Sequence, residues 1–208
     1  EEFDIPIIGI PGTIDNDLAG TDFTIGYDTA INTVVDAVDK IRDTAESHDR
    51  LFVIEVMGRD SGLIALRSGI STGAEAVLIP ELEVDYNAIM KRLDSTRKNK
   101  SSRIIIVAEG DEEGGLVVAD KIKENFPHYD VRVSILGHIQ RGGKPSCMDR
   151  VLASRLGVAS VEGLIEGRRG EMAGLICGEV QFTPFSKAIK HIDKINTNLT
   201  RIVEILSL

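Results

Sequence analysis

The sequence has no tryptophan, and aromatic residues make up only 4% of its 208 residues. This scarcity argues against a surface that stacks nucleic-acid bases. The formal net charge of -9 argues in the same direction, because proteins that bind duplexes carry a basic face. Small anionic ligands stay possible, since a few local arginines and helix N-termini are enough to hold them.

Cysteine is also rare, and the two that are present, Cys147 and Cys177, have no metal-binding or redox spacing. They predict two free thiols in a reducing compartment. No apolar run approaches the roughly 20 residues of a membrane span, and no secretory signal is visible. We therefore expect a cytoplasmic protein with no membrane contact. The chain begins Glu1-Glu2-Phe3 without a methionine, which suggests a fragment or a processed product.

Two nucleotide-binding motifs are missing. The sequence contains neither the G-x-x-x-x-G-K-[ST] phosphate loop nor the G-x-G-x-x-G dinucleotide fingerprint. A nucleotide site must therefore be built differently or lie outside this chain.

What the sequence does contain is an alternation of strand-like and helix-like segments. Short apolar runs predict strands at 5–10, 51–56, 76–79, 103–108, 131–136 and 173–177. Apolar residues at helical spacing or helix-favouring composition predict helices at 22–45, 61–72, 86–98, 117–125 and 149–166. Such alternation predicts an α/β fold, doubly wound, with mostly parallel sheets and helices on both faces. Ligands then bind beyond the carboxyl ends of strands, where the polar segments 12–17, 58–62 and 137–143 lie.

The first of these polar segments carries Asp15 and Asp17 directly after a predicted strand. Two carboxylates so close in sequence can supply a general base and a Mg²⁺ contact. The alternative is a polar turn with local Asp and Asn hydrogen bonds, and it is the better interpretation of the pair alone.

The other two segments carry basic side chains beside glycines. Arg59 follows Gly58 at a strand end, where its guanidinium would suit a transferring phosphoryl group. His138 and Arg141 flank a glycine-rich turn after the strand that holds Arg132, and they could clamp one phosphate. The alternatives are a surface arginine and a loop histidine.

Together these segments resemble the phosphofructokinase family. The matching stretches are PGTIDND at 11–17, the GTD-T-IG run at 20–26, EVMGR at 55–59, LGHIQRGG at 136–143 and DRVLASRLG at 149–157. The resemblance spans nearly the whole chain and fades after about Glu179. It implies two Rossmann-like domains, the first incomplete: 1–26 with 139–208 on the ATP side, and 27–138 on the sugar-phosphate and effector side.

The resemblance also implies roles for individual residues. Asp15 would be the base that deprotonates the 1-hydroxyl of fructose 6-phosphate, Asp17 would organise Mg²⁺, and Thr13 and Arg59 would contact the transferring phosphoryl group. The sugar phosphate would be bound by Met57, Gly58, Glu109, His138 and Arg141, with Arg50 and Arg132 reaching across from a neighbouring subunit. A complete site therefore implies an oligomer, a homotetramer in this family.

The resemblance further bears on the phosphoryl donor and on regulation. Gly12, before Thr13, goes with ATP in the family, whereas lysine goes with pyrophosphate.

Positions of the family's allosteric nucleotide site match Arg42, Gly73, Glu75, Lys98 and Lys100, although surface charges explain these residues equally well. The implied reaction is phosphoryl transfer from ATP to fructose 6-phosphate, with Mg²⁺, and residues 1–208 alone are expected to be inactive. The alternatives are a pyrophosphate-dependent relative and a non-catalytic sugar-phosphate-binding module.

Overall fold

The computed structural model describes residues 5–45, 50–95, 103–111, 113–191 and 197–206. Its internal contacts divide the chain into two compact units. The first unit comprises Glu1–Thr29 and Lys144–Asp193, and the second comprises Ala30–Gly143 and Lys194–Leu208. The predicted domains stay a prediction. The predicted boundaries after residues 26 and 138 lie within a few residues of the observed divisions after Thr29 and Gly143. Residues 194–208, which the prediction placed in the first domain, group with the second unit.

The second unit is built on a sheet of four parallel strands in the order β5-β6-β4-β7. The strands are β4 (Arg50–Val56), β5 (Ala76–Leu78), β6 (Arg103–Ala108) and β7 (Asp130–Ile135). Every residue of β6 is buried, as expected of a strand covered on both faces. The predicted parallel sheet is therefore confirmed.

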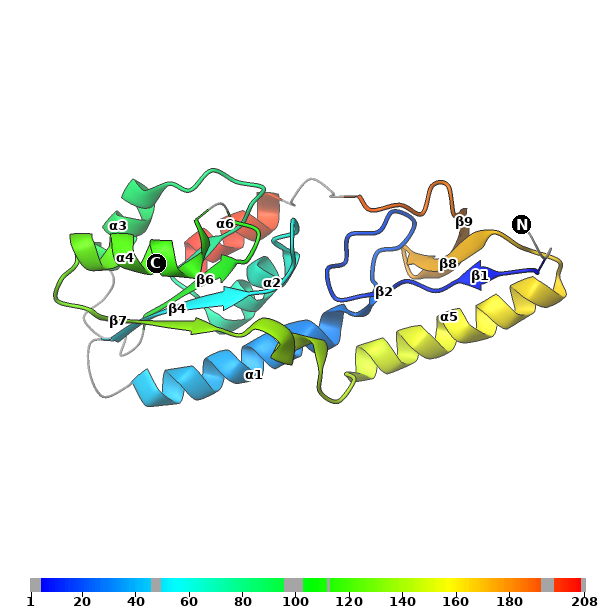
Figure 1. Ribbon diagram of the computed structural model, residues 1–208, viewed down its shortest axis with the longest axis horizontal. Helices are drawn as coiled ribbons and strands as arrows, with labels where there is room; N and C mark the ends of the chain where they lie inside the picture. Colours follow the sequence, from blue (N-terminus) through cyan, green and yellow to red (C-terminus); the bar gives the residue numbers. More distant parts are fainter. Residues whose placement is uncertain (1–4, 46–49, 96–102, 112, 192–196, 207–208) are drawn as a thin grey trace. The chain divides into compact units, whose positions relative to one another are not determined.

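Helices cover both faces of this sheet. They are α1 (Tyr27–Ala45), α2 (Leu63–Thr72), α3 (Tyr86–Ser95), α4 (Gly114–Asn125) and α6 (Thr197–Leu206). Leu51 and Val53 of β4 pack with buried residues of α3 and α4 in one core cluster. The alternate residues Phe52 and Ile54 are buried as well, and α1 runs along the side opposite α3 and α4 (Figure 1).

The first unit is smaller and contains a sheet in the order β1-β8-β9, packed against α5. Its elements are β1 (Ile8–Gly9), β2 (Gly12–Thr13), β3 (Ile25–Gly26), α5 (Cys147–Ile165), β8 (Glu171–Ile176) and β9 (Glu179–Pro184). Strand β9 was not predicted, and it pairs antiparallel with β8. The two-residue turn between them, Cys177–Gly178, has φ angles of 51° and 85°, which match a tight hairpin turn.

One predicted helix start is wrong. The apolar period suggested a helix from Asp22, but α1 begins at Tyr27 because Ile25 and Gly26 pair with Gly12 and Thr13 instead. Buried Asp149 of α5 then accepts hydrogen bonds from the backbone amides of Gly26 and Thr29, at 2.9 and 2.8 Å. A carboxylate at this position satisfies amides that the first turn of a helix leaves without partners.

Two smaller expectations concern the cysteines and membranes. Cys147 and Cys177 are both free and exposed. Within the described ranges, no helix combines the length and the apolar character that crossing a bilayer requires.

Candidate functional site

The carboxyl edge of the four-stranded sheet gathers the predicted sugar-phosphate residues of the second unit. Strand β4 lies between β6 and β7, so the segments that follow these three strands are neighbours. They contribute Gly58 and Arg59 after β4, Glu109 after β6, and the short 3-10 helix Gly137–Arg141 after β7. The structure thus brings together residues that lie 50 to 83 positions apart in sequence.

Glu109 shapes the turn that presents Arg59. Its Oε1 accepts hydrogen bonds from the backbone amides of Arg59, at 2.9 Å, and Gly58, at 3.3 Å. Both residues have positive φ, 144° at Gly58 and 53° at Arg59. A Cβ at Gly110 would lie only 1.7 Å from the carbonyl oxygen of Arg59, so the two backbone segments are in close contact. A non-glycine residue at positive φ is strained, and such strain is concentrated at functional sites.

Gln140 is the residue that sequence reasoning missed at this edge. Its side chain is 1% exposed. Its Oε1 accepts from the backbone amide of Met57 at 3.2 Å, and its Nε2 donates to the carbonyl of Gly137 at 3.0 Å. The amide side chain therefore ties the 3-10 helix to the end of β4, while His138 and Arg141 of the same helix are exposed. A ligand could reach both of them.

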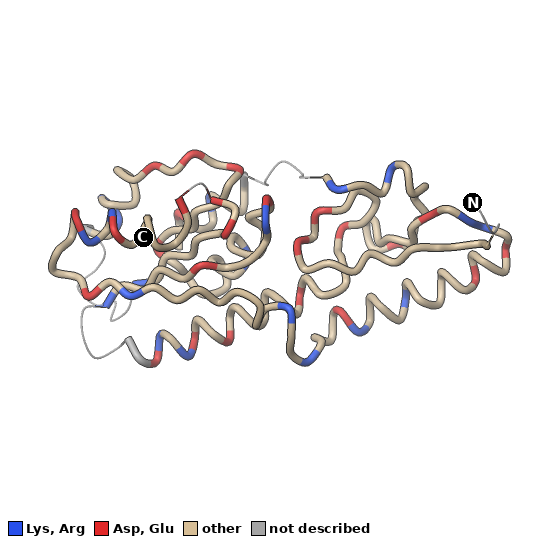
Figure 2. Tube along the Cα trace, in the orientation of Figure 1, with Lys and Arg blue, Asp and Glu red and all other residues tan. Residues whose placement is uncertain are grey.

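Arg50 and Arg132 lie elsewhere, on the amino side of the sheet. Arg50 is the first residue of β4, and Arg132 is aligned with Phe52 of the same strand. Both form ion pairs with Asp130, and basic residues gather where β4 and β7 begin (Figure 2). The seven residues of β4 separate this edge from Gly58 by roughly 20 Å. Arg50 and Arg132 therefore do not join His138 and Arg141 within one chain.

In the first unit, the loop that carries Asp15 and Asp17 is held by Asn16. The backbone of Asn16 has a φ of 53°. Its side chain accepts a hydrogen bond from the backbone amide of Thr24 at 2.7 Å and donates one to the carbonyl of Asp22 at 3.1 Å. The amide of Asp15 donates to Thr13 Oγ1 at 3.2 Å. Asp15 and Asp17 are 6% and 7% exposed. Two nearly buried carboxylates thus sit on a loop with fixed geometry.

A second residue that sequence reasoning missed contacts Asp17. Lys190 Nζ lies 3.3 Å from Asp17 Oδ2, and the amide of His191 donates to the Asp17 carbonyl at 2.7 Å. The family resemblance fades after about Glu179, and a lone lysine beyond that point carries no sequence signal. The contact shows that residues 189–191 support the loop of the two carboxylates.

A metal site is less complete. Among the residues that the structure describes, no three His, Cys, Asp or Glu side chains form a group that could hold a metal ion. Mg²⁺ in phosphoryl-transfer sites takes one or two protein carboxylates and completes its shell with phosphates and water. Asp17 fits that limited demand.

The predicted effector residues are partly described. The Arg42 guanidinium of α1 donates to the Thr72 carbonyl, next to Gly73, which ends α2 with φ of 61°. Glu75 follows and is 2% exposed. Lys98 and Lys100 lie outside the described residues.

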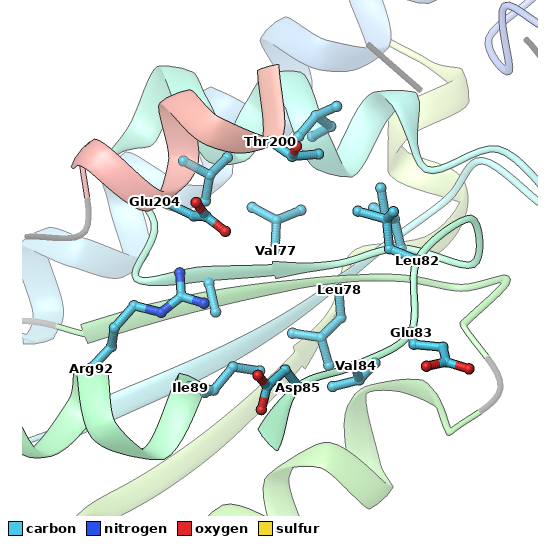
Figure 3. Close-up of a pocket in the computed structure, with 14 residues that line it drawn as sticks. Val77, Leu78, Leu82, Glu83, Val84, Asp85, Ile89, Arg92, Thr200 and Glu204 are labelled. Carbon is cyan, nitrogen blue, oxygen red and sulfur yellow. The ribbon is translucent and has the colours of Figure 1, made fainter. Parts of the chain in front are cut away.

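A cavity of about 150 Å³ lies between β5, α3 and α6 (Figure 3). Apolar side chains such as Val77, Leu82 and Ile89 line it, together with Arg92 and Glu204. None of the residues predicted for catalysis or binding lines this cavity.

Comparison with known sequences shows that the chain is similar to phosphofructokinases. A family model described as phosphofructokinase matches residues 1–164. An ATP-dependent 6-phosphofructokinase of Cytophaga hutchinsonii is 57% identical over 208 residues, which cover 99% of this chain and 63% of that protein. ATP-dependent 6-phosphofructokinase 2 of Bacteroides thetaiotaomicron is 52% identical over 210 residues, which cover 100% of this chain and 64% of that protein. The chain thus spans slightly less than two thirds of the length of these relatives.

Solved structures show the same fold. A phosphofructokinase from Saccharomyces cerevisiae superimposes with a TM-score of 0.82 at 30% identity, covering 97% of this chain and 28% of that one. A pyrophosphate-dependent phosphofructokinase from Marinobacter aquaeolei gives a TM-score of 0.79, covering 98% of this chain and 60% of that one. At 22% identity the second match speaks for the fold alone.

Proposed function

The chain belongs to the phosphofructokinase family, and from that premise we propose that it serves the transfer of the γ-phosphoryl group of ATP to the 1-hydroxyl of fructose 6-phosphate. One observation carries the proposal. Glu109, after β6, and Gln140, after β7, each accept hydrogen bonds from the backbone at the end of β4, and the resulting edge presents Arg59, His138 and Arg141. Such an edge offers positive charge to an anionic substrate.

The proposed reaction is a direct in-line displacement. The sugar 1-hydroxyl oxygen attacks the γ-phosphorus, the bond from that phosphorus to the β–γ bridging oxygen breaks, and ADP leaves with those electrons. Asp15 accepts the hydroxyl proton, while Arg59 and Thr13 stabilise the transferring group. The rigid loop around Asp15 supports this role, because a base must be held within hydrogen-bond reach of the proton it removes.

Substrate binding uses both edges of the sheet in this proposal. Met57 and Gly58 line the sugar, Glu109 accepts hydrogen bonds from its hydroxyls, and His138 and Arg141 hold the 6-phosphate. Glu109 uses Oε1 for two backbone amides, which leaves Oε2 as the oxygen for the sugar. Arg50 and Arg132 serve the site of a neighbouring copy in a homotetramer, since they lie far from His138 in their own chain.

Asp17 is the proposed contact for Mg²⁺. When bound, the ion would offset the negative charge of the phosphate groups during transfer. The role of the chain is to keep Asp17 in place, and the hydrogen bond from the His191 amide to the Asp17 carbonyl supports that. Lys190 lies 3.3 Å from Asp17 Oδ2, so the ion would compete with this ammonium group for that oxygen.

We propose ATP rather than pyrophosphate as the donor, because the similar proteins of Cytophaga hutchinsonii and Bacteroides thetaiotaomicron are named ATP-dependent. Gly12 is the residue of this chain that goes with that donor in the family resemblance. We also propose a cytoplasmic location, and an effector site that includes Arg42, Gly73, Glu75, Lys98 and Lys100.

The test compares turnover and binding in the gene product that contains these residues. With ATP and fructose 6-phosphate, Asp15→Ser should lower kcat at least a hundredfold, because general-base catalysis contributes about 10²–10⁴. Fructose 6-phosphate binding, measured by calorimetry, should survive. Normal turnover in this variant would show that Asp15 is not the base. Faster turnover of wild type with pyrophosphate would exclude ATP as the natural donor, and binding without any turnover would favour a non-catalytic module.

A further inference from the structure

Three charged side chains meet on one face of the sheet where β4 and β7 begin. Asp130 is the first residue of β7 and is aligned with Arg50 of β4, while Arg132 lies two residues along β7. Residues two apart on a strand share a face. Arg132 Nε is 3.0 Å from Asp130 Oδ1, and Arg132 Nη2 donates to Oδ2 at 3.1 Å. Arg50 Nε is 3.4 Å from the same Oδ2, at ion-pair distance.

The Asp130 carboxylate therefore binds the Arg132 guanidinium in a bidentate manner. An arginine binds carboxylates and phosphates best through two parallel N–H donors, and the Nε and Nη2 of Arg132 are both directed at Asp130. The side chains of Arg50, Asp130 and Arg132 are 30%, 44% and 61% exposed, so a ligand from solvent can reach them. A phosphate group and the Asp130 carboxylate would compete for the same donors.

We infer that Asp130 is a built-in counter-anion, which the 6-phosphate of the substrate must displace from Arg50 and Arg132. This inference rests on the proposed function, which assigns those arginines to phosphate binding. A phosphate monoester carries about -1.5 to -2 charges and three acceptor oxygens, whereas a carboxylate carries one charge and two oxygens. The exchange therefore favours a phosphate and disfavours singly charged anions. Asp130 makes substrate binding weaker and more selective for phosphate.

A purely structural Asp130 would have the opposite consequence. If the carboxylate only oriented the two guanidinium groups, its loss would disorder them and weaken phosphate binding. Competition predicts tighter binding after the charge is removed. The direction of the change in affinity thus separates the two roles.

The experiment is calorimetric titration of the gene product that contains these residues, with fructose 6-phosphate and separately with inorganic phosphate. Asp130→Asn should lower both dissociation constants about three- to tenfold, the size of change that loss of two exposed ion pairs allows. Asp130→Glu keeps the competing charge and should stay near wild type. Asp120→Asn is the matched control, because Asp120 is an exposed carboxylate paired with Lys123 at 3.0 Å on α4.

The Arg132→Ala variant shows how much of the measured affinity for fructose 6-phosphate and for inorganic phosphate depends on Arg132. Loss of affinity in Arg132→Ala with tighter binding in Asp130→Asn supports the inference. Unchanged or weaker phosphate binding in Asp130→Asn, with Arg132→Ala still weakened, overturns the inference and leaves the proposed function standing. Absence of fructose 6-phosphate binding in wild type counts against the proposed function instead, and the titration with inorganic phosphate then decides the role of Asp130 by itself.

Discussion

Replacing Gln140 by alanine tests whether one buried amide holds the substrate-binding edge together. The substitution would leave the Met57 amide, in a residue that is 6% exposed, without its acceptor. The Gly137 carbonyl would lose its side-chain donor but stays within the 3-10 helix, where a backbone amide three residues on is its regular partner. A buried polar group that loses its partner costs about 1–3 kcal/mol, so we expect a loss of about 1–3 kcal/mol in the free energy of unfolding.

Urea unfolding followed by circular dichroism measures this loss. Ile139→Ala is the matched control, because Ile139 is the neighbouring residue and its side chain is 59% exposed, so its truncation should cost less than about 0.5 kcal/mol. Gln140→Glu keeps an acceptor for Met57 but buries a carboxyl group and turns an oxygen toward the Gly137 carbonyl, so it should cost at least as much as Gln140→Ala. A loss below about 0.5 kcal/mol in Gln140→Ala would refute the view that this amide joins β4 to β7.

Two further changes test other contacts. Asp149→Ala removes the acceptor of the Gly26 and Thr29 amides and should cost about 3–4 kcal/mol in urea unfolding, with Asp149→Asn intermediate; equal stability of all three proteins would contradict the helix-anchoring role. Burial and the hydrogen bond to Glu113 raise the pKa of the Tyr86 hydroxyl. The neutral hydroxyl therefore contributes fully to the stability of the folded protein below about pH 10, the ordinary pKa of tyrosine, and this contribution is lost as the pH rises further. Tyr86→Phe should therefore flatten the alkaline fall in stability, and an unchanged pH profile would contradict this.

The strands of the second unit could be predicted because parallel strands buried on both faces are continuous apolar runs. Residues 103–108 illustrate this, since prediction and structure agree at both ends. The hairpin strand β9 and the final helix α6 were missed, because β9 mixes exposed and half-buried positions and α6 is short and lies beyond the recognisable motifs. Their assignment depends on packing against β8, and against α2 and β5, which local sequence does not record.

The candidate site was predictable where its residues carry charge next to glycine, and not where they act through other residues. Arg59 and His138 stood out at strand ends, and the structure places both segments on one edge. Gln140 and Lys190 were invisible, because their partners lie 83 and 173 positions away. A buried glutamine beside an exposed isoleucine reverses the usual preference, and this reversal appears only after folding.

The position of the arginines bears on why such a site would require more than one chain. His138 and Arg141 lie at the carboxyl edge of the sheet, and Arg50 lies at its amino edge, about 20 Å away along β4, with Arg132 in the amino half of β7. One phosphate group spans only a few ångströms, so Arg50 can bind the same phosphate as His138 only if two copies each contribute one edge. Each copy then gives one half of a site to one neighbour and receives the complementary half. Such reciprocal contacts close naturally in a two-fold symmetric assembly. In that arrangement the Asp130 carboxylate shields the donated arginines until the substrate phosphate reaches them.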